Sequence, residues 1–224
     1  MRMLAVFEKS ERIRHIGHLD IQRSVQRGLR RSGLPVAYSQ GFNPHILITF
    51  ASALSTGACG KREIMDVTMS EDVETEEFLT RMNRAMSPEM QLSEARAVDN
   101  HHPSLMGALS AAEYDLTIRD EETAKALTGA IQAILEKEFV PAMRKTKTKL
   151  EEVNIRPLIL TLSGEGKHIR ATLVLTEKES CKPQMLMEAL KNQACITDEV
   201  RMLVTRERLL GTDRDGQLIP LEKL

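Results

Sequence analysis

The sequence predicts an α+β protein made of two tandem ferredoxin-like domains with antiparallel sheets. Two observations support this: each half shows the order strand, helix, strand, strand, helix, strand, and residues 98–110 between the halves are turn-rich and aperiodic. The expected domains are 1–99, with a basic helix and an SQGFNPH turn, and 111–224, joined by a linker at 100–110. Right-handed crossovers place both helices of each half on one sheet face and leave the other face free. A single mixed α+β domain is the competing interpretation.

The first half begins with an apolar run at residues 3–7, which is typical of a buried strand. A helix is predicted at 19–33, because apolar residues recur at every fourth position and Gly33, followed by Pro35, suits a left-handed C-terminal cap. The other elements predicted for this half are extended segments at 35–38, 46–50 and 63–69, a helix at 75–86 and a strand at 90–98.

The second half repeats this order of elements. Alternating apolar residues predict a strand at 114–118, and Asp120 as N-cap with an apolar stripe predicts a helix at 120–137. Between the halves, His101 and His102 are expected to be solvated. The remaining predictions are extended segments at 153–162 and 168–176, a helix at 183–193 and a strand at 199–209.

The composition is that of a soluble globular protein, with 42% hydrophobic and 28% charged residues and no Trp in 224 residues. The three cysteines are widely spaced, which argues against a disulfide framework and against a closely spaced triple-cysteine iron–sulfur site. The sequence has no glycine-rich nucleotide-binding motif and no apolar run as long as a membrane span. We therefore expect a cytoplasmic protein that does not contact a membrane and has no cofactor or metal.

Positive charge is concentrated near the N-terminus. Residues 1–50 hold eight Lys and Arg against three Asp and Glu, a net charge of +5, and the rest of the chain carries −6. On a helical projection, the arginines of the 19–33 helix fall between about 20° and 120°, away from its apolar stripe at about 200° to 280°. They are Arg23, Arg27, Arg30 and Arg31, and Asp20 is the one acid on their face. Because the Arg donor fork suits phosphate, this face predicts a phosphate- or carboxylate-binding surface, with an ordinary solvated face as the alternative.

The SQGFNPH turn after this helix is held in shape by its own residues. Glycine can take the positive φ that such a turn uses, and proline fixes its own backbone and restrains the residue before it. The residues expected to contact an anion or RNA are Ser39, Gln40, Gly41, Asn43 and His45. The helix and the turn together predict one preformed concave anion site, and a tight hairpin with incidental polar residues is the alternative.

Histidines near this region offer two further alternatives. His15, His18 and His45 could ligate a metal together with Asp20, or the three histidines could act as acid and base in a metal-independent ribonuclease. A second group of cations could extend a phosphate track. This group consists of Arg144, Lys145, Lys147, Lys149 and Arg156.

Residues 18–45 read HLDIQRSVQRGLRRSGLPVAYSQGFNPH, and Gly57, Glu63, Asp66 and an NIRPLI segment at 154–159 follow. This pattern resembles the radical SAM-linked family, a bacterial domain of unknown function, over nearly the whole chain. Family members are typically encoded beside, or fused to, radical SAM proteins with a cobalamin-binding-type domain. The resemblance therefore implies a radical SAM protein as partner.

The chain departs from that family pattern in two places. Ile46 and Leu47 stand where Pro-Lys is usual, so one expected cation is missing, and Asn154 stands where Asp is usual. A function of that lysine or that carboxylate is therefore not carried over to this chain.

Taken together, these features predict an RNA-binding adaptor without catalytic activity of its own. It would act with a radical SAM partner in tRNA or rRNA modification or processing. The aromatic content of 3% favours recognition of backbone and shape over base stacking. Two alternatives stay open: a ribonuclease or RNA-modifying subunit that uses His acid–base chemistry, and a protein-interaction module whose arginines dock on the radical SAM partner.

Overall fold

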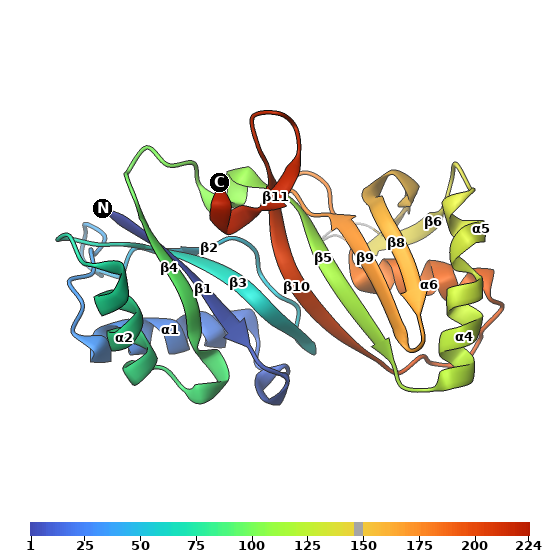
Figure 1. Cartoon of the computed structure of the whole chain (residues 1–224), viewed down its shortest axis with the longest axis horizontal. Helices are drawn as coiled ribbons and strands as arrows, with labels where there is room; N and C mark the ends of the chain where they lie inside the picture. The colour runs from blue at the N-terminus through green and yellow to red at the C-terminus, as the bar shows by residue number, and fades with distance from the viewer. Residues whose placement is uncertain (146–149) are drawn as a thin grey trace. The chain divides into compact units, whose positions relative to one another are not determined.

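The computed structural model describes residues 1–145 and 150–224, and strands and helices follow one another along the chain (Figure 1). This content confirms the predicted α+β class. Within the described ranges, no helix is both long and apolar enough to cross a membrane.

The chain divides into two units by the density of its internal contacts. The first consists of Met1–Leu109 and Arg208–Leu224, and the second of Ser110–Glu207. The sequence assigned the whole of 111–224 to a C-terminal domain, whereas its last residues lie with the first unit here.

The first unit begins with the order strand, helix, strand, strand, helix, strand. These elements are β1 (Arg2–Lys9), α1 (His18–Ser32), β2 (Ile48–Phe50), β3 (Ala58–Thr68), α2 (Thr75–Ala85) and β4 (Leu92–Val98). The pairs β1 with β3, β1 with β4, and β2 with β3 are all antiparallel. Figure 1 shows α1 and α2 side by side along one face of these strands.

Helix α1 forms where the sequence predicts it. Its apolar stripe of Ile21, Val25 and Leu29 is buried in the core between the helices and the sheet. The helix ends at Gly33, which takes the left-handed conformation with φ +66° that a residue with a Cβ rarely adopts. Local spacing and the glycine cap thus fix the position of α1.

The opposite face of this sheet is covered, so the expectation of a free face is wrong for the first unit. Leu4, Val6 and Ile64 are buried there, as is Leu221. Elements of the same unit lie on this face: α3 (Leu105–Ala108) contacts β2 and β3, and the short 3₁₀ helix η4 (Leu221–Lys223) contacts β1. β11 (Leu218–Pro220) precedes η4. The cover comes from segments distant in sequence, which the order of elements within one half cannot reveal.

The second unit also contains two helical regions and a sheet. Its elements are β5 (Leu109–Ile118), α4 (Glu121–Gly129), α5 (Ile131–Leu135), β6 (Pro141–Lys145), β7 (Leu150–Asn154), β8 (Ile159–Glu165), β9 (His168–Val174), α6 (Pro183–Gln193) and β10 (Met202–Thr212). Strands β5 and β10 contribute residues to both units.

Several predicted elements of this region differ from the structure. The helix expected at 120–137 is two helices, α4 and α5, that meet at Ala130. The extended segment expected at 153–162 is interrupted by the 3₁₀ helix η3 (Arg156–Leu158), because Pro157 cannot donate to a strand ladder. The β6–β7 hairpin was not predicted, and part of the expected linker at 100–110 forms α3 and the start of β5.

Nine of the described strands share one hydrogen-bonded sheet in the order β4-β1-β3-β10-β5-β9-β8, with β2 paired to β3 and β11 to β10. The strands β6 and β7 pair only with each other among the described residues. The strand expected at 35–38 is absent from this sheet, since Val36 and Tyr38 make only isolated bridges. The strand expected at 46–50 forms in part, as β2 (Ile48–Phe50).

Candidate nucleic-acid interface

The four arginines of α1 are all exposed, and two of them have partners within the protein. Arg23 lies 3.0 Å from Asp20, and both side chains are more than 60% exposed. Arg31 donates to the backbone oxygen of Ala85 at 2.6 Å. An exposed ion pair within one helix is worth only about 0.3–0.5 kcal/mol, so Arg23 can exchange Asp20 for another anion at little cost.

Arg27 and Arg30 are exposed and make no ion pair or hydrogen bond within the described part of the chain. Arg30 lies in the last turn of α1, where the helix dipole stabilises a positive charge. Arg27 lies two turns after the start of the helix and has no such explanation. These two guanidinium groups are the ones most available to an external anion.

Arginines also fix the two helices of the first unit to each other. Arg31 of α1 binds the oxygen of Ala85, the last residue of α2, and Arg81 of α2 donates to the oxygen of Ser32, the last residue of α1, at 3.0 Å. Each helix therefore has a terminal carbonyl satisfied by a side chain of the other. Arg31 has a structural role that the sequence did not indicate.

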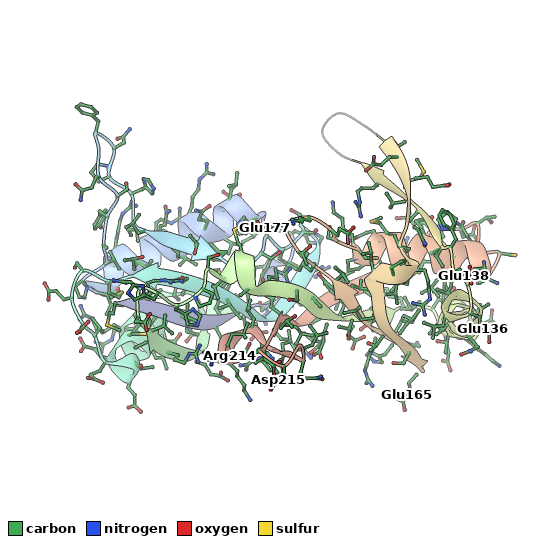
Figure 2. All side chains as sticks on the ribbon, turned by 90° about the horizontal axis from the view of Figure 1, so that it is seen from above. Glu136, Glu138, Glu165, Glu177, Arg214 and Asp215 are labelled. Atoms are coloured by element: carbon green, nitrogen blue, oxygen red, sulfur yellow. The ribbon has the colours of Figure 1, made fainter. Side chains whose placement is uncertain are left out.

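The predicted turn lies at the end of an arm, which we define as residues 36–47. Figure 2 shows the arm as a pale blue hairpin that projects from the first unit. Its two sides are joined by the bridge between Tyr38 and Ile46 and by a hydrogen bond from the Leu47 N–H to the Ala37 oxygen at 2.9 Å. The arm is therefore a short paired structure, and only its tip is a turn.

The tip of the arm is closed by Ser39 and His45. The Ser39 N–H donates to the His45 oxygen at 2.9 Å, and the Ser39 hydroxyl accepts from the His45 N–H at 3.1 Å. The same hydroxyl lies 2.8 Å from His45 Nδ1. Gly41 has φ +126°, so it needs the conformational freedom that the sequence predicts. Gln40 and Asn43 are exposed and make no hydrogen bond with the described residues.

His45 and Leu47 also line a cleft of about 490 Å³ on the first unit. Arg2 and Asp66 lie at its wall and form an ion pair whose side chains are 15% and 6% exposed. The hydrogen bond to Asp66 is the main reason that the pKa of Arg2 is raised. Because Arg2 also donates to the His102 oxygen at 2.5 Å, its donors are used within the protein. The cleft therefore has no free cation from this pair.

No arginine of α1 lines this cleft, so it is not the concave site shared by the helix and the turn that the sequence predicts. The reason is strand alternation. Thr49 and Asp66 are paired neighbours that line the cleft, whereas Val67, the next residue of β3, belongs to the core beneath α1. The basic helix and the cleft thus lie on opposite sides of the sheet.

The histidines do not form a metal site. Across the described ranges, no three His, Cys, Asp or Glu side chains are placed to hold a metal ion, and this includes His15, His18, Asp20 and His45. His15 is exposed, and the His18 ring packs edge-on against Phe50 at 5.3 Å.

His18 lines a small internal pocket together with Lys9 and Glu63, which are only 2% and 4% exposed. Lys9 was not among the predicted site residues. Its position just after the apolar run at 3–7 could have indicated that it is buried. Lys9 donates to the Arg14 oxygen at 2.8 Å. The pocket volume of about 10 Å³ is at the limit of what one water molecule needs, so this pocket does not admit a substrate.

Most of the described second group of cations has internal partners. Arg144 donates to the Ser180 oxygen at 3.3 Å, and Arg156 donates to the oxygens of Leu135 and Ile159 at 3.1 and 3.2 Å. Lys145 belongs to β6, and Lys147 and Lys149 lie outside the described residues.

Asn154 has a structural role in the second unit. Its Oδ1 accepts from the N–H groups of Val140 and Arg156 at 2.9 and 3.0 Å, and its Nδ2 donates to the Glu138 oxygen at 3.0 Å. A carboxylate could accept the first two hydrogen bonds but could not donate the third. Asn at position 154, in place of the usual Asp, therefore satisfies three backbone groups around it.

The expectation of two solvated histidines at 101 and 102 is wrong for the second. His102 Nε2 lies 3.1 Å from the Leu224 oxygen, and its Nδ1 lies 3.0 Å from the Pro103 oxygen. The backbone oxygen of His102 accepts from Arg2, while His101 is exposed. The contacts of His102 with Arg2 and Leu224 could not be predicted, because these residues are about 100 or more positions away in the sequence.

The chain belongs to the DUF2344 family, described as "Uncharacterized protein conserved in bacteria", which matches residues 2–186. A comparison with curated proteins gives no match. Among solved structures, this chain is similar to one titled "X-ray crystal structure of a heavy metal efflux pump, crystal form I", with 12% identity and a TM-score of 0.25. The similarity covers 92% of this chain and spans 28% of the length of the other. It carries no argument about fold or function.

Proposed function

We propose that this protein is a non-catalytic RNA-binding adaptor that acts with a radical SAM partner in the modification or processing of tRNA or rRNA. The partner is inferred from the resemblance of residues 18–45 and 154–159 to the radical SAM-linked family. The RNA is inferred from the exposed basic face of α1. DUF2344 membership is compatible with this proposal but assigns no activity.

The proposal includes a ferredoxin-like architecture for each unit. The first unit has the strand order β4-β1-β3-β2, and strands of the second have the order β10-β5-β9-β8. In both, the first strand of the set lies beside the third and the fourth, as in a split βαβ arrangement. The inserted β6–β7 hairpin and the divided helix α4–α5 are additions to that arrangement in the second unit.

The observation that supports RNA binding most strongly is the availability of Arg27 and Arg30. Both are exposed on a face whose one acid, Asp20, is already paired with Arg23. Unpaired guanidinium groups on a fixed helix match the spacing and charge of phosphates better than flexible lysines do. A docking surface for an acidic protein would use the same charges, so the experiment must separate the two.

The test is the double charge reversal Arg27→Glu/Arg30→Glu, measured by fluorescence anisotropy with labelled bulk tRNA. We expect at least a tenfold loss of affinity, because two attractive contacts become repulsive. The matched control is Lys125→Glu/Lys178→Glu, which makes the same change in net charge at two exposed positions of the second unit.

The outcomes separate the proposal from its alternatives. Equal tRNA binding by the wild type and the Arg27→Glu/Arg30→Glu variant contradicts the proposal. Loss of a co-expressed radical SAM partner in a pull-down, with tRNA affinity unchanged, identifies the arginine face as a protein-docking surface instead. Cleavage of tRNA in the presence of EDTA, abolished by His18→Ala, identifies a ribonuclease.

A further inference from the structure

Phe42, at the tip of the arm, is fully exposed, with a relative exposure of 109%. Of the other phenylalanines, Phe139 is 54% exposed, and the rest are buried: Phe7, Phe50 and Phe78. An aromatic ring held in water contributes nothing to the folded core, since its burial is what stabilises a protein. Phe42 therefore has no structural role that the fold explains.

The position of Phe42 is fixed by the arm. Three contacts between Ser39 and His45 close the turn that carries Phe42, and the bridge from Tyr38 to Ile46 joins the two sides below it. A partner that binds the Phe42 ring meets a turn that is already ordered, so less conformational entropy is lost on binding.

The surroundings of Phe42 favour a nucleic acid over an apolar protein pocket. The arm that carries Phe42, residues 36–47, contains no Asp or Glu. The side chains beside Phe42 in the turn are polar: Gln40 and Asn43 are exposed and without hydrogen bonds in the described residues. An aromatic ring flanked by amide groups, on an acid-free segment, has the chemistry that binds an unpaired base and its adjacent phosphates.

We infer that Phe42 stacks on an unpaired nucleobase of the bound RNA. This inference rests on the proposed RNA-binding function and adds the part of the RNA that the arm contacts. It replaces the expectation, drawn from low aromatic content, that bases are not stacked. The position of one aromatic ring, and not the number of aromatic residues, decides whether a base can stack.

The substitution Phe42→Trp provides a direct probe, because the chain has no Trp and the new indole is then the single fluorophore of its kind. The probes are a single-stranded RNA oligonucleotide and heparin, a polyanion without bases. We expect the RNA to quench the Trp emission and heparin to bind without quenching. The matched control is Phe139→Trp, an exposed position outside the arm, whose emission should not change with either probe.

Affinity measurements on Phe42→Ala and Phe42→Leu complete the test. Loss of one stacked base weakens binding by about 5- to 150-fold, and both variants should melt at the wild-type temperature because the ring is exposed. Leucine keeps an apolar side chain but has no aromatic face, so RNA affinity should fall in this variant too.

Each remaining result contradicts the inference. If Phe42→Ala binds the RNA as tightly as the wild type, or if heparin and RNA quench Phe42→Trp equally, Phe42 does not stack on a base. Full RNA affinity of Phe42→Leu would show that the aromatic face is not needed, which contradicts stacking. If the wild type binds no RNA, the proposed function fails as well, whereas RNA binding that depends on Arg27 and Arg30 but not on Phe42 overturns this inference alone.

Discussion

The Ser39 hydroxyl lies 2.8 Å from His45 Nδ1 and accepts a hydrogen bond from the His45 N–H at 3.1 Å. One side chain thus binds both the backbone and the ring of the residue that ends the turn. This arrangement orders the tip of an arm that is otherwise exposed to water, and it holds His45 at the edge of the cleft.

Replacement of Ser39 by Ala should weaken RNA binding without a comparable loss of stability. The substitution removes the acceptor of the His45 N–H and the partner of its ring, so the turn becomes more mobile before it binds. A hydrogen bond of about 0.5–1.5 kcal/mol corresponds to a loss of affinity of about 2- to 10-fold. Titration with labelled tRNA measures this loss. Ser163→Ala, at an exposed position of the second unit, is the control, and equal affinities for the two variants would argue against a fixed turn.

Gly28 lies where α1 packs closely against Met86, the residue that follows α2. A Cβ at this position would lie 2.4 Å from the Sδ of Met86. Gly28→Ala should lower the melting temperature, because overpacking costs about 1–3 kcal/mol while the alanine gains about 0.5–1 kcal/mol in a helix. Thermal denaturation followed by circular dichroism tests this. Gly129→Ala in α4 meets no atom within 4 Å and should not lower the melting temperature. A Gly28→Ala protein as stable as the wild type would show that Met86 moves freely.

The three cysteines should differ in reactivity. Cys195 is exposed, whereas Cys59 and Cys181 are buried. Burial raises the pKa of the Cys59 thiol and raises that of Cys181 to about 12, so neither forms a thiolate near neutral pH. A chromogenic disulfide reagent should therefore label one thiol rapidly in the folded protein and three after denaturation. Rapid labelling of Cys181 in the folded state would contradict its buried position.

Stability should depend on the ionisation of Asp120 at acid pH. Its side chain accepts from the Thr123 N–H at 2.7 Å at the start of α4, and the hydrogen bonds with Thr123 lower its pKa. A lowered pKa means that the folded state favours the carboxylate. The ionised Asp120 contributes its full stabilisation above the usual pKa of an aspartate. This stabilisation is lost as the pH falls through the lowered pKa of Asp120 in the folded protein.

Asp120→Asn keeps an N-cap side chain but cannot titrate. Melting temperatures measured over an acid pH series should therefore fall less steeply for this variant than for the wild type. Asp198→Asn, at an exposed position outside the helices, is the control. Parallel pH profiles for the wild type and Asp120→Asn would contradict the role of the cap.

The sequence predicted the elements that local rules determine. Helix α1 follows from the four-residue spacing of Ile21, Val25 and Leu29 and from the conformation that Gly33 permits. The positive φ of Gly41 was foreseen for the same reason, since both depend on residues that are close in sequence. Features that depend on residues close in sequence can therefore be predicted from a single sequence.

Long-range relationships were not predictable from one sequence. Arg2 and Asp66 are 64 residues apart, and their ion pair uses the charge of Arg2 within the protein. The faces of β2 and β3 separate the cleft from the arginines of α1. Phe42 was missed because aromatic residues are usually core residues, and only the paired sides of the arm show that its ring is in water.

The salt dependence of RNA binding tests the central claim most directly. Affinity for labelled bulk tRNA is measured over a range of salt concentrations for the wild type and for Arg27→Glu/Arg30→Glu. If both arginines bind phosphates, the plot of log affinity against log salt should be shallower in the variant by about 1.4–1.8, the release of two counterions. Equal slopes and affinities for the two proteins, or no tRNA binding by the wild type at low salt, would contradict the claim that α1 binds RNA.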